Sequence, residues 1–234
     1  MNPEQIKYVD EAITQRHSVR AFLNRPVEQE TILDILNVAA RSPSGSNTQP
    51  WKVYIVTGEK REHLIQRVCQ AQIEQFLHPE QDSKYQETFA YYPEKWVSPF
   101  IERRRENGWG LYGLLNIQKG DKEKMAAQLL RNFQLFDAPV GLFFTVSNAM
   151  GIGAKMDIAM FMQNVMVAAK ARGLDTCPQA AWNHFHSIVL NVLDAPEHEE
   201  LVCTIALGYA DPDAIVNNFI TPREPAENFC VFVN

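Results

Sequence analysis

The sequence of 234 residues has few cysteines and none of the spacings that bind zinc or form a disulfide framework. Its four cysteines stand at positions 69, 177, 203 and 230, without a CxxC pair. The chain also has no Walker A phosphate loop and no GxGxxG dinucleotide fingerprint. These absences disfavour a zinc module and a resident nicotinamide cofactor, and we interpret the cysteines as thiols of a reducing cytoplasm.

Basic residues and long apolar runs are also scarce. The chain has 22 Lys and Arg against 28 Asp and Glu, a net charge of −6, which argues against nucleic acid or anionic membranes as partners. No apolar run approaches the roughly 18 residues of a membrane span, and the polar first ten residues do not resemble a secretory signal. The triplet Arg103-Arg104-Arg105 is a local exception that we interpret as a solvated helix face. We expect a cytoplasmic protein.

The composition, with 46% apolar and 21% charged residues, is that of a single globular domain over residues 1–234. Apolar periodicity predicts helices over 3–15, 28–40, 60–77, 121–136, 155–172 and 187–193. Short apolar runs predict strands over 52–57, 140–146, 174–177 and 201–207, with a turn at 178–181. This alternation indicates an α/β or α+β sandwich with helices on both faces of the sheet.

Two further regions carry apolar residues in unusual places. The predicted helix over 155–172 is apolar nearly all round, which requires burial on most faces, as a central helix or at a dimer interface. After Pro212 the tail still carries late apolar residues between polar ones. This pattern suggests that residues 212–234 form an arm that packs on another subunit.

Residues 16–20 are the first candidate binding segment. If the segment is extended, Arg16, Ser18 and Arg20 project to one face, because side chains alternate along a strand. Two fixed positive charges and a hydroxyl suit a phosphate or another anion. A surface salt-bridge cluster is the alternative.

Residues 42–51 are the second candidate. The run is rich in Ser, Pro, Gly and Asn and predicts an ordered loop. Gly45 permits a ligand to approach closely, Ser44 and Asn47 can donate and accept hydrogen bonds, and Trp51 offers a flat face. The alternative is a connector without a function.

Residues 78–117 are rich in aromatic residues and interrupted by Gly and Pro. We expect short helices joined by loops, which could form a lid over a planar ligand; ordinary packing is the alternative.

Two weaker signals lie near the C-terminal half. His184 and His186 could place two imidazoles on one strand face as a metal pair, although the alternative of two packing histidines is favoured because no third ligand has a matching motif. Cys177 could be a nucleophile, but no general base accompanies it, and a small apolar residue in the wall of a binding site is the favoured alternative.

Four stretches together resemble the FMN-dependent nitroreductase family of the oxygen-insensitive type. They are Ser-Pro-Ser-Gly-x-Asn-x-Gln-Pro-Trp over 42–51, Arg-His-Ser-Val-Arg over 16–20, Cys-Pro-Gln over 177–179, and Arg223. They occur in the family's order and at roughly its spacing. The resemblance implies a nitroreductase-like α+β fold, with a central, mostly antiparallel sheet flanked by helices. It also implies a homodimer, with residues 212–234 exchanged between subunits and residues 78–117 shaping the substrate pocket.

The resemblance also implies a set of FMN-binding residues: Arg16, His17, Ser18, Arg20, Pro43, Ser44, Asn47, Gln134, Pro178, Gln179, Ala180 and Arg223. Arg16, Ser18 and Arg223 would hold the phosphate, and Arg20 would reach the pyrimidine edge of the ring. Residues 42–47 of one chain would face residues 16–20 of the other. The candidate substrate pocket consists of Trp96, Phe100, Trp109 and Tyr112.

Two positions depart from the family pattern. Ala180 and Ala181 replace an acidic residue and a glycine of well-known members, and Gln134 replaces a lysine of some members.

The implied activity is an NAD(P)H-dependent, ping-pong reduction of a nitroaromatic, a quinone or an activated enone. NAD(P)H would bind transiently, and we assign no catalytic side chain and no metal, because solvent can supply the protons. Two alternatives stay open: a flavin-binding sensor or storage protein without turnover, and a metal-dependent hydrolase that uses His184 and His186.

Overall fold

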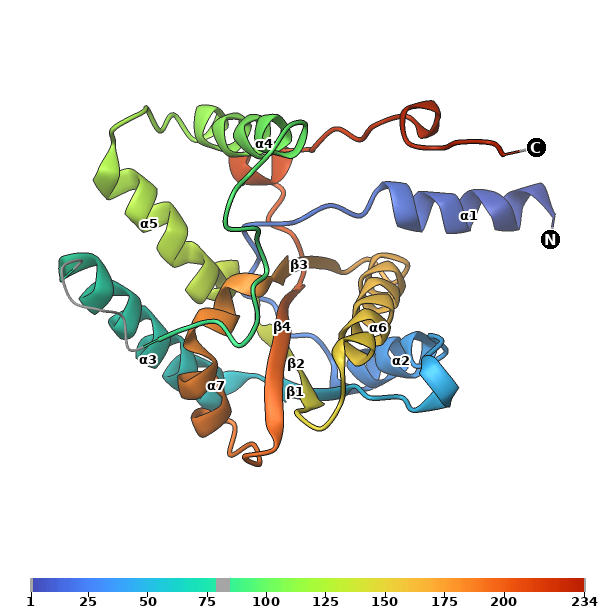
Figure 1. Ribbon diagram of the computed structural model, residues 1–234, viewed down its shortest axis with the longest axis horizontal. Coiled ribbons are helices and arrows are strands. Elements are labelled where there is room, and N and C mark those ends of the chain that lie inside the picture. Colours follow the sequence, from blue (N-terminus) through green and yellow to red (C-terminus); the bar gives the residue numbers. More distant parts are fainter. Residues whose placement is uncertain (1, 79–84, 234) are drawn as a thin grey trace.

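A computed structural model describes residues 2–78 and 85–233 (Figure 1). The described part contains seven α-helices: α1 (Pro3–Thr14), α2 (Gln29–Ala39), α3 (Gly58–Leu77), α4 (Phe100–Leu114), α5 (Lys122–Phe133), α6 (Ile152–Lys170) and α7 (His186–Val192). Its four strands are β1 (Lys52–Val56), β2 (Val140–Ser147), β3 (Asp175–Gln179) and β4 (Glu199–Gly208). The predicted elements are therefore present, with boundaries that differ by a few residues.

The four strands form one sheet in the order β1-β2-β4-β3, and all three neighbouring pairs are antiparallel. β2 and β4 lie in the interior, and their almost wholly buried runs explain why the sequence shows continuous apolar stretches there. The outer edge of β3 is covered by the segment after α1, where Ser18 forms a parallel bridge with Thr176. The predicted α+β fold with an antiparallel sheet is confirmed.

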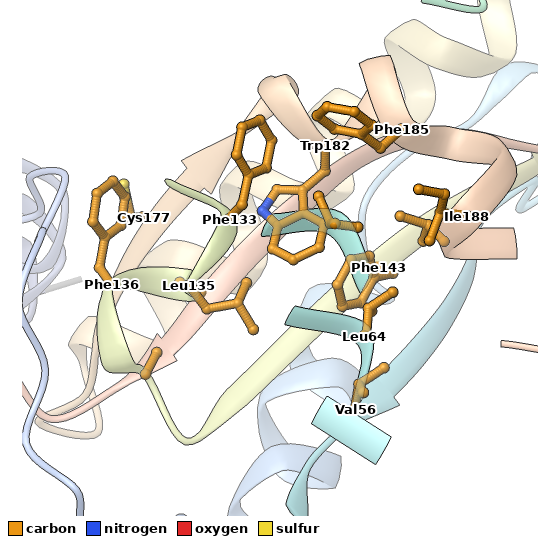
Figure 2. Close-up of a cluster of buried hydrophobic side chains, with 14 of the residues drawn as sticks. Val56, Leu64, Phe133, Leu135, Phe136, Phe143, Cys177, Trp182, Phe185 and Ile188 are labelled. Carbon is orange, nitrogen blue, oxygen red and sulfur yellow. The ribbon is translucent and has the colours of Figure 1, made fainter. Parts of the chain in front are cut away.

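Helices cover both faces of the sheet and build two cores. In Figure 1, α3, α5 and α7 lie on one side of the sheet, and α2 and α6 lie on the other. The first core is centred on Trp182, whose ring meets those of Phe133 and Phe143 edge-on at centroid distances of 5.7 and 5.2 Å (Figure 2). Its indole N–H donates to the Asn132 carbonyl at 3.1 Å, so the buried ring leaves no polar atom unpaired.

α6 packs against α2 and the sheet with only one of its faces. Ile158, Phe161 and Val165 are buried, whereas Ile152, Met156 and Met160 are exposed in the single chain. Within the single chain this helix is therefore not buried on most faces. The alternative of a dimer interface stays a prediction. None of the helices in the described ranges is both long and apolar enough to cross a bilayer.

Residues 85–117 contain one long helix instead of the short helices that we expected. α4 runs through Gly108, Gly110 and Gly113 without a break, and residues 85–99 contain no helix. Packing explains Gly110: a Cβ there would lie 2.7 Å from the Phe219 ring, so a close helix contact outweighs the low helix propensity of glycine. Part of the expected lid, residues 79–84, lies outside the described residues.

The predicted turn at 178–181 was placed two residues too early. Pro178 and Gln179 complete β3 opposite Ile205 and Thr204, and a 3-10 helix, Ala180–Phe185, follows. β3 is the last strand of the sheet, so Pro178, which has no N–H to donate, is tolerated there.

Candidate functional site

Residues 16–20 run along the outer edge of β3. The N–H of Val19 donates to the Thr176 carbonyl at 3.1 Å, and the Val19 side chain is fully buried. Arg16, Ser18 and Arg20 lie on the side of Cys177, since all three act on its thiol. Two cations and a hydroxyl therefore meet at β3.

The Cys177 thiol does not neutralise these cations. Burial raises its pKa to about 11, and the opposing effects of Arg20, Ser18 and Arg16 are smaller. The thiol is therefore protonated at neutral pH. Figure 2 shows it beside Phe136 at the edge of the first core, which agrees with a small wall residue and not with a nucleophile.

Arg223 lies close to Arg16, although the two are far apart in the sequence. The pKa of Arg16 is lowered, first by burial and then by the positive charge of Arg223. Hydrogen bonds to the Thr221 hydroxyl at 2.7 Å and the Pro222 carbonyl at 2.8 Å hold the Arg223 guanidinium. Within residues 2–78 and 85–233 no carboxylate forms an ion pair with either arginine. Two neighbouring guanidiniums without a carboxylate partner among the described residues are an arrangement that suits an anion.

Several polar atoms in the same region are buried without a partner among the described residues. They are His17 Nε2, Thr176 Oγ1 and Gln179 Oε1. The other end of the Gln179 amide donates to the Asn132 carbonyl at 2.6 Å, so its orientation is fixed. Because an unpaired buried polar atom costs about 1–3 kcal/mol, their grouping at β3 and the 16–18 segment is typical of a binding site.

Gln134 lies at the C-terminal end of α5, in a tight turn. Leu135, Phe136 and Asp137 all have positive φ, at 53°, 53° and 69°. Arg131 donates to the Gln134 side-chain oxygen at 3.0 Å and to both Asp137 oxygens at 2.8 and 2.6 Å. The strained turn is joined to the candidate site by the N–H of Phe22, which donates to the Phe136 carbonyl at 3.1 Å.

The loop over residues 42–51 lies against α6, away from the arginines. The Gly45 N–H donates to Asp157 at 3.1 Å, Asn164 donates to the Ser42 hydroxyl at 2.7 Å, and Trp51 stacks on Phe161 at 4.7 Å. Among the described residues no hydrogen bond or ion pair joins this loop to residues 16–20. Within one chain the structure therefore groups Arg16, Ser18, Arg20, Arg223 and β3, but leaves Pro43, Ser44 and Asn47 elsewhere.

None of the four predicted pocket aromatics is among the residues that line the groove between α4 and the tail. Trp109 and Tyr112 meet edge-on on α4 at 6.2 Å, while Trp96 lies under the Arg104 guanidinium at 5.0 Å and Phe100 is exposed. The groove has a volume of about 1030 Å³. Its lining residues are Arg103, Glu106, Asn107, Gly110, Phe219, Ile220, Thr221, Pro222, Arg223, Glu224 and Phe229. Arg223 lines this groove, so the groove adjoins the candidate cations. A second cavity, between α3 and α5, is lined by none of Arg16, Arg20 and Arg223.

The proposed metal pair is not supported. His184 belongs to the 3-10 helix and His186 is the first residue of α7, so the two do not share a strand face. Burial lowers the pKa of both imidazoles, and His184 Nε2 lies 3.1 Å from the Gln75 side-chain oxygen. The described part of the chain contains no group of three residues that could hold a metal ion.

Sequence reasoning missed Asn132, Arg131 and Asn217. The Asn132 carbonyl holds Gln179 and Trp182, Arg131 holds Gln134, and the Asn217 side chain holds the backbone at Arg20. Their roles depend on residues that meet only in the fold, and no local pattern marks them.

Comparisons with known proteins find relatives that align with nearly the whole chain. The model of the nitroreductase family matches residues 13–209. A 4-nitrobenzoate reductase of Pseudomonas putida is 35% identical, over 96% of this chain and 95% of that protein. A chloronitrobenzene nitroreductase of Comamonas testosteroni is 36% identical, over 97% of both chains. The crystal structure of the FMN and NADPH-dependent nitroreductase NfnB from Sphigopyxis sp. strain HMH superposes with a TM-score of 0.89 at 34% identity, covering 97% of this chain and 99% of that one.

Proposed function

Because this chain belongs to the nitroreductase family, we propose that it is an FMN-dependent oxidoreductase that uses NADPH or NADH to reduce nitroaromatic compounds. The observation that carries the proposal is the pair Arg16 and Arg223, two guanidiniums brought together without a counter-ion among the described residues. Full-length relatives named for nitrobenzoate and chloronitrobenzene reduction support this substrate class over quinones and enones.

The residues at β3 fit FMN. Arg16, Ser18 and Arg223 would hold its phosphate, and Arg20 would lie at the ring, where reduction creates negative charge. Pro178 and Gln179 at the end of β3, and Ala180 directly after it, would border the reactive edge of the ring. His17, Thr176 and Gln179 bring the polar atoms that have no partner among the described residues, and Gln134 would approach from the end of α5.

FMN, when bound, supplies the two-electron chemistry that no amino-acid side chain provides. The protein itself would bind, orient and shield the cofactor: the arginines would fix its anionic end, and the buried residues around Cys177 would exclude water. The groove between α4 and the tail, which adjoins Arg223, would admit the nicotinamide donor and the aromatic acceptor in turn. We further propose that residues 78–117 shape this space in the assembled protein, with Trp96, Phe100, Trp109 and Tyr112 near the acceptor.

We propose that the site is completed by a second copy of the chain. The unburied apolar residues of α1, α6 and the tail support a homodimer: Ile6, Val9, Ile13, Ile152, Met156, Met160, Phe229, Val231, Phe232 and Val233. In Figure 1, α1 and the C-terminal end project on the same side, beyond the body of the molecule. Pro43, Ser44 and Asn47, which lie away from the arginines within one chain, would reach the cofactor of the partner.

The test of function is the spectrum of the purified protein, followed by turnover. We expect a yellow protein with about one non-covalent FMN per chain, because its cationic site suits a phosphate, and steady NADPH oxidation when 4-nitrobenzoate or nitrobenzene is added without oxygen. Recovery of FAD, or of no flavin after gentle purification, would contradict the cofactor. Bound FMN that is reduced once but shows no turnover would favour the sensor or storage alternative.

Assembly can be tested separately by sedimentation with absorbance in the flavin band. A chain cut after Pro225 keeps Asn217 and Arg223 but lacks residues 226–234, the exposed end of the arm, and we expect it to lose both dimer and flavin. A chain cut after Gly208 should lose both as well, through the arm and the arginine together. A shortened chain that sediments as a folded, yellow monomer would show that each chain builds its own site.

A further inference from the structure

The side chain of Asn217 uses its full hydrogen-bonding capacity, with three of its four hydrogen bonds on the segment that carries Arg20. Its oxygen accepts from the N–H of Arg20 at 2.8 Å and from that of Ala21 at 3.2 Å. Its nitrogen donates to the carbonyls of Ala21 at 2.8 Å and Asp211 at 2.9 Å. Asn217 lies in the short 3-10 helix Ile215–Asn218, so the tail fixes the backbone at Arg20 from outside the sheet.

The guanidinium of Arg20 is fixed as well. One of its nitrogens donates to the Ser18 carbonyl at 3.2 Å, and its carbon lies 5.9 Å from the centroid of the Phe219 ring. Phe219 is itself held in place, because the same ring touches Gly110 of α4. The described residues offer no carboxylate within ion-pair distance of Arg20, so its charge is placed but not neutralised.

We infer that Asn217 is a positioning residue that sets the reduction potential of the bound flavin through Arg20. The inference rests on the proposed function. A fixed charge stabilises a developing charge better than a mobile one, because its position requires no reorganisation when the electrons arrive. Arg20 lies beside Cys177, directly before the strand residues that would border the ring. Releasing its backbone would weaken the stabilisation of the reduced, anionic flavin more than that of the oxidised form.

The experiment measures the midpoint potential of FMN by equilibration with a reference dye in full-length dimeric protein. The variants are N217A, R20M and the double variant. N218A is the matched control, because Asn218 is the same residue type in the same 3-10 helix and is exposed. We expect N217A to lose about tenfold of the preference for reduced over oxidised FMN, which for two electrons is a potential about 30 mV more negative. R20M should shift the potential at least as far, and N218A should leave it unchanged.

The double variant decides whether Asn217 acts through Arg20. We expect it to have the potential of R20M alone; shifts that add would mean that Asn217 acts independently and would overturn the inference. If N217A does not fold, F219L serves instead, since it keeps apolar packing beside Gly110 but removes the ring face under Arg20. For F219L we expect a smaller shift to a more negative potential, and this shift should disappear in the R20M background. If F219L leaves the potential unchanged, the inference is overturned.

Failure of the inference differs from failure of the proposed function. If the wild-type protein binds no FMN, both are wrong. If the wild type binds and turns over FMN, and N217A has the same potential, only the role of Asn217 is wrong. A variant that weakens the binding of oxidised and reduced FMN equally would show a merely structural role, which also overturns the inference.

Discussion

The charged groups at the two ends of strand β4 differ in whether the chain itself neutralises them. At its first residue, Glu199 is buried with three partners: Lys52 at 2.6 Å, Thr145 at 2.7 Å and Tyr54 at 2.8 Å. Burial would raise the pKa of this carboxyl, but the hydrogen bonds from Lys52, Thr145 and Tyr54 outweigh it, so the pKa lies below its ordinary value. The chain supplies everything that this charge needs.

At the far end, β4 pairs with β3, and the 16–20 segment and the tail bring arginines to that edge. Burial and the positive charge of Arg223 lower the pKa of Arg16, and no carboxylate of the described residues compensates the two charges. The difference teaches how a structural charge and a binding charge can be told apart. A structural charge is neutralised by the fold, whereas a binding charge is held in place for a partner that arrives later.

The largest effect should come from removing the satisfied charge. Glu199→Ala leaves the Thr145 and Tyr54 hydroxyls without their acceptor, which we expect to lower the free energy of unfolding by about 3 kcal/mol. Urea unfolding followed by circular dichroism measures it. Glu197→Ala, at an exposed position two residues earlier, is the control and should be close to neutral. Equal stability of the two variants would contradict the structural role of Glu199.

Removing an unsatisfied charge should affect binding and spare the fold. Arg223→Ala should weaken FMN binding by about 1.5–3 kcal/mol, the contribution of a hydrogen bond to a charged group. The same change removes a like charge from Arg16, so the flavin-free protein should be no less stable than the wild type. Titration of flavin-free protein with FMN and a thermal melt measure the two quantities. Arg67→Ala, at an exposed position on α3, controls for the loss of a positive charge, and an unchanged FMN dissociation constant in Arg223→Ala would refute the role.

The packing beneath Arg20 gives a smaller effect with an internal control. Gly110→Ala would place a Cβ within 2.7 Å of the Phe219 ring, and we expect the displaced ring to cost about 1 kcal/mol of stability. Gly108→Ala is on the same helix with nothing within 4 Å, so it should stabilise by up to about 1 kcal/mol through helix propensity. Thermal unfolding of both variants measures the contrast, which would be lost if α4 did not pack on Phe219.

The smallest effect concerns pH. Because the pKa of Glu199 is lower in the folded state, its contribution is fully present above the unfolded value of about 4.3 and is lost as the pH falls through the lowered folded value. Above pH 5, Glu199 should add no pH dependence to the free energy of unfolding. Urea midpoints between pH 3 and 7 should decline less steeply with acid in Glu199→Gln than in the wild type. An identical decline would place the acid sensitivity elsewhere.

Local sequence patterns predicted most of the helices and strands, because the forces that form them act between residues that are close in the sequence. Apolar periodicity located the helices and strands, because the side-chain repeat of each element must match its buried face. The period-two pattern of residues 16–20 predicted that Arg16, Ser18 and Arg20 share one side, and all three lie near enough to Cys177 to affect its pKa. The same local reasoning went wrong in α4, where three glycines indicated breaks that the helix does not have; only at Gly110 does packing against Phe219 account for the glycine.

The sequence by itself determined most of the elements and a layered arrangement of helices and sheet. Through the four matching stretches it also determined the family, and with it the antiparallel α+β fold. Only the tertiary structure decided which side chains meet. Arg223 lies beside Arg16, and Asn217 binds the backbone of Arg20, across almost the full length of the chain. Such contacts depend on how the tail returns over the edge of the sheet, and no local periodicity encodes that path. They form because the whole fold is stable, and so the placed but unneutralised charges could be recognised only once the chain had folded.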